Sequence, residues 1–353
     1  MIDKLLIIKT QDGYSLETML SLPETKPNKL VLFVNGSGPF TYNTIRQKAD
    51  GSIFRYFDLF ASEFTKRGIA FCRYNTRGVV DGETPPSYTK INENEYLSYL
   101  PHNSVSDLNS IITYLYQEGY QHTSIYLLGW SEGSIIAPLV ALNQSLNIKG
   151  LLLCGYCNEN LYDTLVWQMN GNSELIQNRR LFDYDKKGYI TKKDFEEDRY
   201  HVRKAVFLDK TFEQLDMDSD GKITSADFAL NSQNYLDEML IAIDKGDDEW
   251  LKENHGIRLT SAWFKEHFSL EPNKNILPKL NLPIHIFAGE YDAMTPVYNA
   301  LDIEIRFHKL GKMNLKTHIF ENHDHDLNYA LYLFKRELSE GLLSIFNVVE
   351  KTQ

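Results

Sequence analysis

The feature that most constrains the fold is a series of short, apolar runs separated by stretches with helical periodicity. Eight runs are predicted to be strands, at residues 5–8, 15–22, 30–34, 69–74, 124–129, 150–154, 283–289 and 315–320. Four predicted helices lie among them, at residues 53–68, 104–119, 132–145 and 297–311. Runs that are apolar throughout are typical of strands buried on both faces. The pattern therefore predicts an α/β fold with an eight-stranded, mostly parallel sheet and helices on both faces.

The interval between the sixth and seventh predicted strands is too long for a single crossover helix. A structureless loop of that size is implausible in a compact domain, so residues 156–271 are predicted to form an inserted helical unit. Residues 1–155 and 272–353 then form the sheet-bearing core. The insertion holds 24 Asp and Glu against 15 Lys and Arg, and so carries most of the formal net charge of −11. An acidic chain argues against nucleic acid or an anionic membrane as a partner.

The sequence also indicates in which cellular compartment the protein is expected. No stretch is long and apolar enough to predict a membrane span, and the N-terminus does not resemble a signal peptide. Cys72, Cys154 and Cys157 are an odd set without disulfide spacing. The CxxC pattern at residues 154–157 ends a predicted buried strand, which does not favour a redox role. We expect a cytoplasmic protein, although export without a cleaved signal would leave the same sequence.

A five-residue turn between a predicted strand and a predicted helix carries a nucleophile pattern. It reads Gly129-Trp130-Ser131-Glu132-Gly133, which matches G-x-S-x-G in the strand-to-helix context that gives this pattern its meaning. The abrupt turn strains the serine backbone and leaves little room for neighbouring side chains, and glycine permits both. Ser131 is therefore the predicted nucleophile, presented above the carboxyl edge of the sheet.

A serine hydroxyl needs a base to take its proton and an acid to orient that base. With such a turn, the expected order along the chain is serine, acid, histidine. Asp292 follows the seventh predicted strand and is the predicted acid, with Glu290 as its rival. After the eighth strand, His325 is preferred as the base because about five residues after Phe320 are needed to fold back to the serine. His323 is the alternative, and the unused histidine is expected to be exposed to solvent.

Acyl transfer also requires backbone donors for the developing oxyanion. One is expected to be the N–H of Glu132, immediately after the nucleophile. The other is expected from the glycine-rich loop at residues 34–40, which follows the third predicted strand, with Ser37 as the donor. This loop lacks G-K-[ST], so a phosphate-binding role is not favoured.

The chain resembles the α/β-hydrolase superfamily, in its esterase, dienelactone-hydrolase and prolyl-oligopeptidase-like branches. Five segments carry the resemblance in order and spacing: NGSGP (35–39), RYNTRG (73–78), GWSEGSIIAPL (129–139), FAGEYDAMTP (287–296) and HDHDLN (323–328). The resemblance implies hydrolysis of an ester, thioester or amide through an acyl-enzyme at Ser131, and a lid after the sixth strand. Asn35 stands where a histidine is common and Ser134 where a further glycine is frequent, which bears on substrate preference.

The insertion contains a loop at residues 216–227 that matches the twelve-residue EF-hand calcium loop. Oxygen ligands are expected from Asp216, Asp218, Asp220, the Lys222 carbonyl, Thr224 and Asp227, with Gly221 at the sharp bend. Asp227 stands at position twelve in place of the usual glutamate. Its shorter arm makes bidentate ligation harder, which favours weaker Ca²⁺ binding or a shift toward Mg²⁺. Flanking helices are expected at residues 206–215 and 228–243.

A second loop of the same frame precedes it, at residues 183–194. Its position five is Lys187, a cation where an oxygen ligand belongs. This loop is therefore expected to bind metal weakly or not at all, and to support its partner. Ile190 and Ile223, at position eight of each loop, are expected to pair as a short ladder.

These patterns predict a serine hydrolase that acts on a small ester substrate. Ca²⁺, or Mg²⁺, is expected in the insertion, with no cofactor for the chemistry itself. The alternative function is a calcium-binding sensor or interaction protein on a catalytically weak hydrolase scaffold. The ordered serine, aspartate and histidine favour the enzyme. The sequence makes no prediction of oligomeric state.

Overall fold

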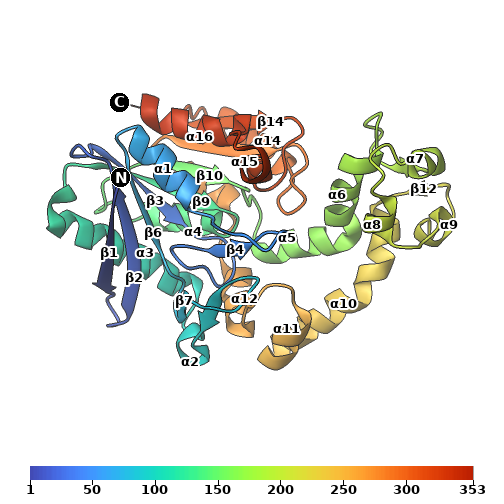
Figure 1. Ribbon diagram of the computed structural model, residues 1–353, viewed down its shortest axis with the longest axis horizontal. Helices are drawn as coiled ribbons and strands as arrows, with labels where there is room; N and C mark the ends of the chain where they lie inside the picture. Colours follow the sequence, from blue (N-terminus) through green and yellow to red (C-terminus); the bar gives the residue numbers. More distant parts are fainter. Residues whose placement is uncertain (353) are drawn as a thin grey trace.

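The computed structural model describes residues 1–352, and its centre is an eight-stranded sheet (Figure 1). The strands lie side by side in the order β1-β2-β6-β3-β9-β10-β13-β14. Their bounds are β1 Ile2–Lys9, β2 Ser15–Leu22, β3 Lys29–Val34, β6 Ala70–Tyr74, β9 Ser124–Trp130, β10 Ile148–Cys154, β13 Ile284–Gly289 and β14 Leu315–Phe320. All eight predicted strands are present, and the predicted fold class is confirmed.

The direction of the strands brings the candidate residues to one edge of the sheet. β2 runs antiparallel to β1 and β6, and the strands from β6 to β14 are parallel. The carboxyl ends of parallel strands meet at the same edge, where ligands bind in open α/β sheets. The loops that follow β3, β9, β13 and β14 therefore lie together, and each carries a predicted site residue.

Helices cover both faces of the sheet (Figure 1). On one face, α3 (Pro101–Leu115), α4 (Gly133–Ala141) and α14 (Tyr298–Lys309) contribute to an apolar core with the strands. On the other, α1 (Asp58–Lys66) and α16 (Glu340–Lys351) contribute to a core that is rich in phenylalanine. The strands between them are apolar throughout because both of their faces are buried.

The start of the predicted helix at residues 53–68 was wrong. Ile53–Arg55 form strand β5, which pairs antiparallel with β4 (Ile45–Gln47), and the helix begins only at Asp58. A second hairpin, β7 (Val79–Asp81) with β8 (Thr89–Ile91), also escaped prediction. Both hairpins have three-residue strands, which are too short to carry a period. Two further short helices, α2 (Glu93–Tyr96) and α15 (Tyr329–Lys335), also lie outside the insertion.

The segment between β10 and β13 is mostly helical, as predicted. It contains α5 Leu161–Trp167, α6 Ser173–Phe182, β11 Ile190–Thr191, α7 Lys192–Glu197, α8 Arg203–Phe207, α9 Phe212–Leu215, β12 Lys222–Ile223, α10 Ser225–Lys245, α11 Asp248–Asn254, α12 Ser261–Ser269 and α13 Asn273–Ile276. Residues 173–228, which we call the paired-loop module, have an apolar core of their own. The predicted ladder is confirmed, because Ile190 pairs with Ile223 between β11 and β12.

The long helix α10 connects the paired-loop module to the rest of the insertion (Figure 1). Its far end packs with α11 and α12 in another apolar cluster. That cluster also contains Tyr96 and Tyr99, which lie outside the insertion. Helix α12 is therefore held directly against the sheet-bearing part of the chain. Within residues 1–352, no helix combines the length and the apolar character needed to cross a membrane.

The helix predicted at residues 206–215 was wrong, because two short helices occupy its place. Helix α8 ends at Phe207, and α9 begins only at Phe212. Leu208 between them has a φ of +57° and an exposed side chain, a backbone conformation that cannot continue a right-handed helix. The helix predicted at residues 228–243 is present within α10, which Thr224 and Asp227 begin earlier through a capping box.

Candidate active site

Ser131 lies at a sharp turn between β9 and α4. Its φ is +56°, the left-handed region that residues other than glycine rarely adopt. A Cβ at Gly129 would lie 2.2 Å from the carbonyl oxygen of Gly133, and a Cβ at Gly133 would lie 2.1 Å from that of Val34. Both glycines are therefore required by the close approach of β9, α4 and β3. The turn holds Ser131 in a strained conformation, as the sequence pattern predicts.

The structure brings Asp292 and His325 together from the loops after β13 and β14. Nδ1 of His325 lies 2.9 Å from both carboxylate oxygens of Asp292. Asp292 is buried and also accepts hydrogen bonds from the backbone N–H of Met294 and from the N–H and hydroxyl of Thr295. These three bonds fix the carboxylate, which in turn fixes the ring of His325.

The charge of Asp292 controls the protonation of His325. Burial of the ring disfavours the charged imidazolium, but the negative charge of Asp292 and its hydrogen bond outweigh this and raise the pKa of His325 to about 9. The neutral ring is therefore a strong base, but below about pH 9 most of it is protonated. Its hydrogen bond through Nδ1 leaves Nε2 as the nitrogen that can serve as a base.

The two rival residues lie elsewhere. His323 is buried, with Nδ1 donating to the carbonyl of Glu321 and Nε2 accepting from the N–H of Gly341. The expectation that the unused histidine is exposed to solvent is wrong for His323, since it supports the start of α16. Glu290 bonds to Lys186 and to the N–H of Asn322, and does not contact His325 in residues 1–352.

Ser131 and His325 line one cavity of about 640 Å³. The N–H of Ser131 donates to the carbonyl of Cys154 at 2.9 Å. Gly155 follows Cys154, and a Cβ on this glycine would lie 2.4 Å from Cε1 of His325. This glycine allows the imidazole to approach the nucleophile turn. The two side chains make no direct hydrogen bond within residues 1–352, and such bonds often tighten only when substrate is present.

The two predicted oxyanion donors lie on either side of the serine. Ser37 lines the same cavity, and a Cβ at the preceding Gly36 would lie 3.5 Å from Cβ of Ser131. Glu132 follows the nucleophile directly. In the described part of the chain, the N–H groups of Ser37 and Glu132 have no hydrogen-bond acceptor. Both donors can therefore serve a substrate oxygen.

The side chain of Glu132 has a role that the sequence did not predict. It is buried, and its carboxylate accepts from Tyr99 Oη at 2.5 Å, from Trp263 Nε1 at 3.2 Å and from His267 Nε2 at 2.9 Å. Trp263 and His267 come from α12 in the insertion. A buried carboxylate needs such partners because its desolvation is costly. An acidic residue inside a buried turn is the one signal in the sequence that could have indicated them.

Tyr99 also contacts the loop that carries Ser37, the other predicted oxyanion donor. Its hydroxyl accepts a hydrogen bond from the N–H of Gly38 at 3.3 Å, while donating to Glu132. One phenol therefore connects the loop that carries Ser37 to the residue after the nucleophile.

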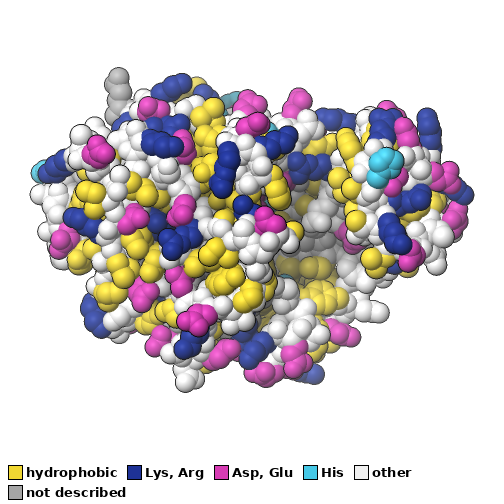
Figure 2. Space-filling model, viewed as in Figure 1, with side chains coloured by type: hydrophobic (Ala, Val, Ile, Leu, Met, Phe, Trp, Pro, Cys, Tyr) yellow, Lys and Arg dark blue, Asp and Glu magenta, His cyan; other side chains and the backbone are white. Residues whose placement is uncertain are grey.

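The cavity is mainly apolar. Its walls include Phe33, Phe40, Phe54, Tyr56, Trp130, Leu165, Met169, Ile257, Phe264 and Leu333. They come from the core, from α5 and the segment after it, and from α12 and the chain before it. Figure 2 shows the surface hollowed between the sheet-bearing part and the paired-loop module, with apolar side chains inside the hollow. Such walls suit an apolar substrate group.

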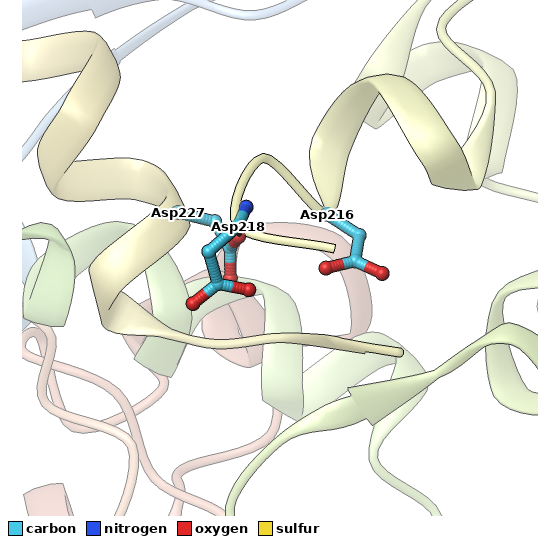
Figure 3. A group of neighbouring side chains, drawn as sticks. All are labelled: Asp216, Asp218 and Asp227. Atoms are coloured by element: carbon cyan, nitrogen blue, oxygen red, sulfur yellow. Dashed lines mark hydrogen bonds between the residues drawn. The ribbon is translucent and has the colours of Figure 1, made fainter. Parts of the chain in front are cut away.

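The second EF-hand-like loop brings three predicted ligands together. Carboxylate oxygens of Asp216, Asp218 and Asp227 lie within 4.8 Å of one another. Figure 3 shows Asp218 beside Asp227, with the carboxylate of Asp216 across the loop. Asp216 and Asp227 are buried and Asp218 is exposed. Hard oxygen ligands at this spacing fit Ca²⁺ or Mg²⁺.

The structure does not bring Asp220 into this cluster. Its Oδ1 accepts from the N–H of Lys222 at 2.9 Å. Asp227 accepts from the N–H groups of Met217 and Thr224, so this residue orders the loop and begins α10 at the same time. Lys222 lies in β12, opposite Thr191 of the first loop.

The first loop is organised around a lysine. Nζ of Lys187 lies 3.0 Å from Asp194, 3.4 Å from Asp185 and 3.8 Å from Asp183. These carboxylates occupy positions one, three and twelve of the loop, where an EF-hand places its ligands. The ammonium of Lys187 therefore stands in for a bound cation. The expectation that this loop binds metal weakly or not at all stays a prediction.

The paired-loop module contacts both loops that carry the acid and the histidine. Arg180 of α6 donates to the carbonyl of Asn322 at 3.0 Å and to the side chains of Asp324 at 3.0 Å and Asn328 at 2.7 Å. These residues flank His325. Lys186 bonds to Glu290 at 2.7 Å, two residues before Asp292. No sequence pattern indicated either contact.

Comparison with solved structures identifies the fold. A thermostable carboxyl esterase from Bacillus coagulans in complex with glycerol is 17% identical with a TM-score of 0.55, and 99% of each chain is covered. The chain has the α/β-hydrolase fold. The α/β hydrolase GrgF from Penicillium sp. sh18 (13% identical) and a proline iminopeptidase from Mycobacterium smegmatis (14% identical) each have a TM-score of 0.53, with 99% of this chain and 98% of theirs covered.

A family model matches one segment of the insertion. The model described as EF hand matches residues 208–229, which include the second EF-hand-like loop. Among curated proteins, no sequence matches this one.

Proposed function

We propose that this protein is a serine hydrolase that cleaves a carboxylic ester through an acyl-enzyme on Ser131. The observation that carries the proposal is the cavity in which the strained Ser131 and the Asp292–His325 pair meet. The fold supports it, and the carboxyl esterase and the proline iminopeptidase with similar structures are hydrolases of esters and peptides by name. Fold likeness alone does not assign a reaction, so the site carries the argument.

The reaction follows from the proposed roles. His325 takes the proton of the Ser131 hydroxyl as Oγ attacks the carbonyl carbon of the ester. The N–H groups of Ser37 and Glu132 stabilise the resulting oxyanion. The carbonyl re-forms as the bond to the alcohol oxygen breaks, and His325 gives its proton to that oxygen. Water, activated by the same histidine, then hydrolyses the acyl-enzyme and releases the acid.

The insertion is proposed to act as a cap with a structural cation. Residues 156–271 supply walls of the cavity, and α12 reaches the buried carboxylate of Glu132. Asp216, Asp218 and Asp227, with the carbonyl of Lys222, would hold Ca²⁺ or Mg²⁺. The cation would neutralise the carboxylates of the loop and order the start of α10. It has no part in the chemistry at Ser131.

The decisive experiment compares the wild type with Ser131→Ala. The wild type should hydrolyse short-chain p-nitrophenyl esters and react with a fluorophosphonate probe, and the variant should do neither. Ser145→Ala, an exposed serine in the same part of the chain, is the control. Turnover retained by Ser131→Ala would exclude the mechanism. An inactive wild type that still binds Ca²⁺ would favour a sensor or interaction protein on a hydrolase scaffold.

The cation is tested separately by calorimetric titration with Ca²⁺ and with Mg²⁺. The wild type should bind one cation, and Asp216→Asn should lose that site. Bound cation should also raise the melting temperature of the wild type by mass action. A wild type that binds neither ion would exclude the cation site without affecting the proposed hydrolase.

A further inference from the structure

A second cavity adjoins the candidate active site. It measures about 450 Å³ and shares Ser37, Phe40, Arg46, Gly256 and Ile257 with the first cavity. The proposed oxyanion donor therefore stands at the boundary between the two. A substrate whose carbonyl oxygen binds at Ser37 can extend directly into this second cavity.

The walls of the second cavity carry positive charge only. Arg46 and Arg258 line it, and none of its lining residues is Asp or Glu. The chain as a whole has a formal net charge of −11. The charge of this cavity, with two guanidinium groups and no carboxylate, is therefore opposite in sign to that of the whole chain. Fixed positive charge in a partly enclosed site attracts anions, because solvent screens it less than at an open surface.

Arg46 is held in place but its charge is not neutralised. Its Nη1 donates to the carbonyl groups of Ile45 at 3.0 Å and Ser87 at 3.2 Å, which orients the guanidinium. Within residues 1–352, Arg46 forms no ion pair with a carboxylate, and its Nε and Nη2 have no acceptor. Burial lowers the pKa of Arg46, and no anion offsets this. The free N–H groups of Nε and Nη2 can donate to the two oxygens of a carboxylate.

Arg258 is only partly compensated. Its Nη2 lies 2.9 Å from Glu93, whose side chain is half exposed, while the side chain of Arg258 is 15% exposed. Its Nε and Nη1 are buried, without a partner in the described residues. The carbonyl of Arg258 accepts from the hydroxyl of Tyr96 at 2.6 Å, so the backbone of this residue is anchored.

We propose that the natural substrate is an ester that also carries a carboxylate. This carboxylate binds in the second cavity, which Arg46 and Arg258 line. This inference rests on the proposed ester hydrolysis and specifies its substrate class. The apolar first cavity accepts the hydrocarbon part, and Arg46 at the junction accepts the anion. Arg46 is then a specificity-determining residue, and the positive charge of Arg258 in the same cavity supports it.

Two pairs of matched esters test the inference and locate the anion. Phenyl acetate and 4-acetoxybenzoate differ by a carboxylate on the leaving group. 4-Nitrophenyl pentanoate and mono-4-nitrophenyl glutarate differ by a carboxylate on the acyl group. In at least one pair, the wild type should prefer the anionic member in kcat/KM by about tenfold or more. The pair that responds identifies the side of the ester that enters the second cavity.

Substitution of Arg46 provides the second arm. Arg46→Gln should reduce the anionic-to-neutral ratio of kcat/KM by about 10- to 100-fold, and Arg46→Lys should retain part of it. Arg55→Gln is the control, because Arg55 lies on the same hairpin but lines neither cavity. A ratio that is the same in the wild type and Arg46→Gln would overturn the inference.

Binding to the Ser131→Ala variant separates this inference from the proposed function. Calorimetry should give a higher affinity for 4-acetoxybenzoate than for phenyl acetate. The double variant Ser131→Ala, Arg46→Gln should bind the two compounds with equal affinity. If the wild type hydrolyses no ester, the proposed function fails and this binding difference still decides on the anion site. If neutral esters are hydrolysed but no anion preference appears in kinetics or binding, only the anion site is excluded.

Discussion

The hydroxyl of Tyr99 lies 2.5 Å from Oε2 of Glu132 and also accepts the N–H of Gly38 at 3.3 Å. This places one buried side chain between the two backbone segments that are proposed to form the oxyanion site. The contact orients the peptide after Ser131 relative to the loop of Ser37. Neither hydrogen bond involves the nucleophile itself, so Tyr99 is a positioning residue.

Tyr99→Phe should lower kcat about tenfold and change KM little, because a misaligned donor weakens binding of the transition state more than of the substrate. Affinity for a trifluoromethyl ketone, which forms a tetrahedral adduct, should fall in parallel. Steady-state kinetics with p-nitrophenyl esters and inhibition by the ketone measure both effects.

Tyr96→Phe is the matched control for Tyr99→Phe. Tyr96 is buried beside Tyr99, but its hydroxyl donates to the carbonyl of Arg258 and not to Glu132. Tyr96→Phe should not change the affinity for the ketone relative to the affinity for the substrate. Equal losses of kcat and ketone affinity in the two variants would mean that Tyr99 acts only through packing.

Lys187 is expected to prevent cation binding in the first loop. Lys187→Asp places a carboxylate at position five and removes the ammonium, so calorimetry should detect two bound Ca²⁺ in place of one. Lys187→Met removes the charge without adding a ligand. It should lower the melting temperature, because the buried Asp194 loses its cation, whereas Asp183 keeps its ion pair with Arg179.

The two Lys187 variants are informative together. Ca²⁺ should restore the melting temperature of Lys187→Asp more than that of Lys187→Met, since only the former gains a complete ligand set. If Lys187→Asp still binds a single Ca²⁺ and is no less stable than the wild type without Ca²⁺, then the lysine does not replace a cation.

Arg180 is expected to link the paired-loop module to the histidine loop. Arg180→Ala removes three hydrogen bonds to the residues around His325. Because the side chain is partly exposed, we expect a moderate effect, with kcat about fivefold lower. Hydrogen exchange in residues 322–328 should become faster, since fewer contacts hold this loop closed.

The control for Arg180→Ala is Arg199→Ala, which breaks an exposed ion pair with Glu197 inside the same module. Exchange in residues 322–328 should not respond to it. Unchanged exchange in Arg180→Ala as well would show that Arg180 does not stabilise the histidine loop.

The sequence predicted the central sheet well because its strands are buried on both faces and their apolar runs are continuous. It also predicted the ladder between Ile190 and Ile223, since the EF-hand frame fixes their positions relative to each loop. These features depend on local pattern. The short hairpin of β4 and β5 was not predicted, because a strand of three residues is too short to show a period.

The contacts around the candidate site could not be predicted, because they join residues far apart in the chain. Glu132 meets Trp263 and His267 across more than a hundred positions. Arg180 meets Asp324 in the same way. The sequence indicated only that Glu132 is an acidic residue at a buried position, and the identity of its partners depends on how the insertion folds back.

The pH dependence of hydrolysis should follow the protonation of His325. Burial opposes the charged ring, but Asp292 raises its pKa to about 9. A general base acts only when neutral, so kcat/KM for a neutral ester should rise about tenfold per pH unit up to about pH 9 and then level off. Asp292→Asn removes the raising charge, so the midpoint should shift to lower pH while kcat falls about 10⁴-fold.

Two comparisons make this prediction decisive. A neutral ester is needed because an anionic substrate would add its own dependence on charge. His323→Ala should keep the midpoint of the wild type, since His323 contacts Glu321 and Gly341 and not Asp292. A profile whose midpoint does not respond to Asp292→Asn, or that moves with His323→Ala, would remove His325 from the role of base.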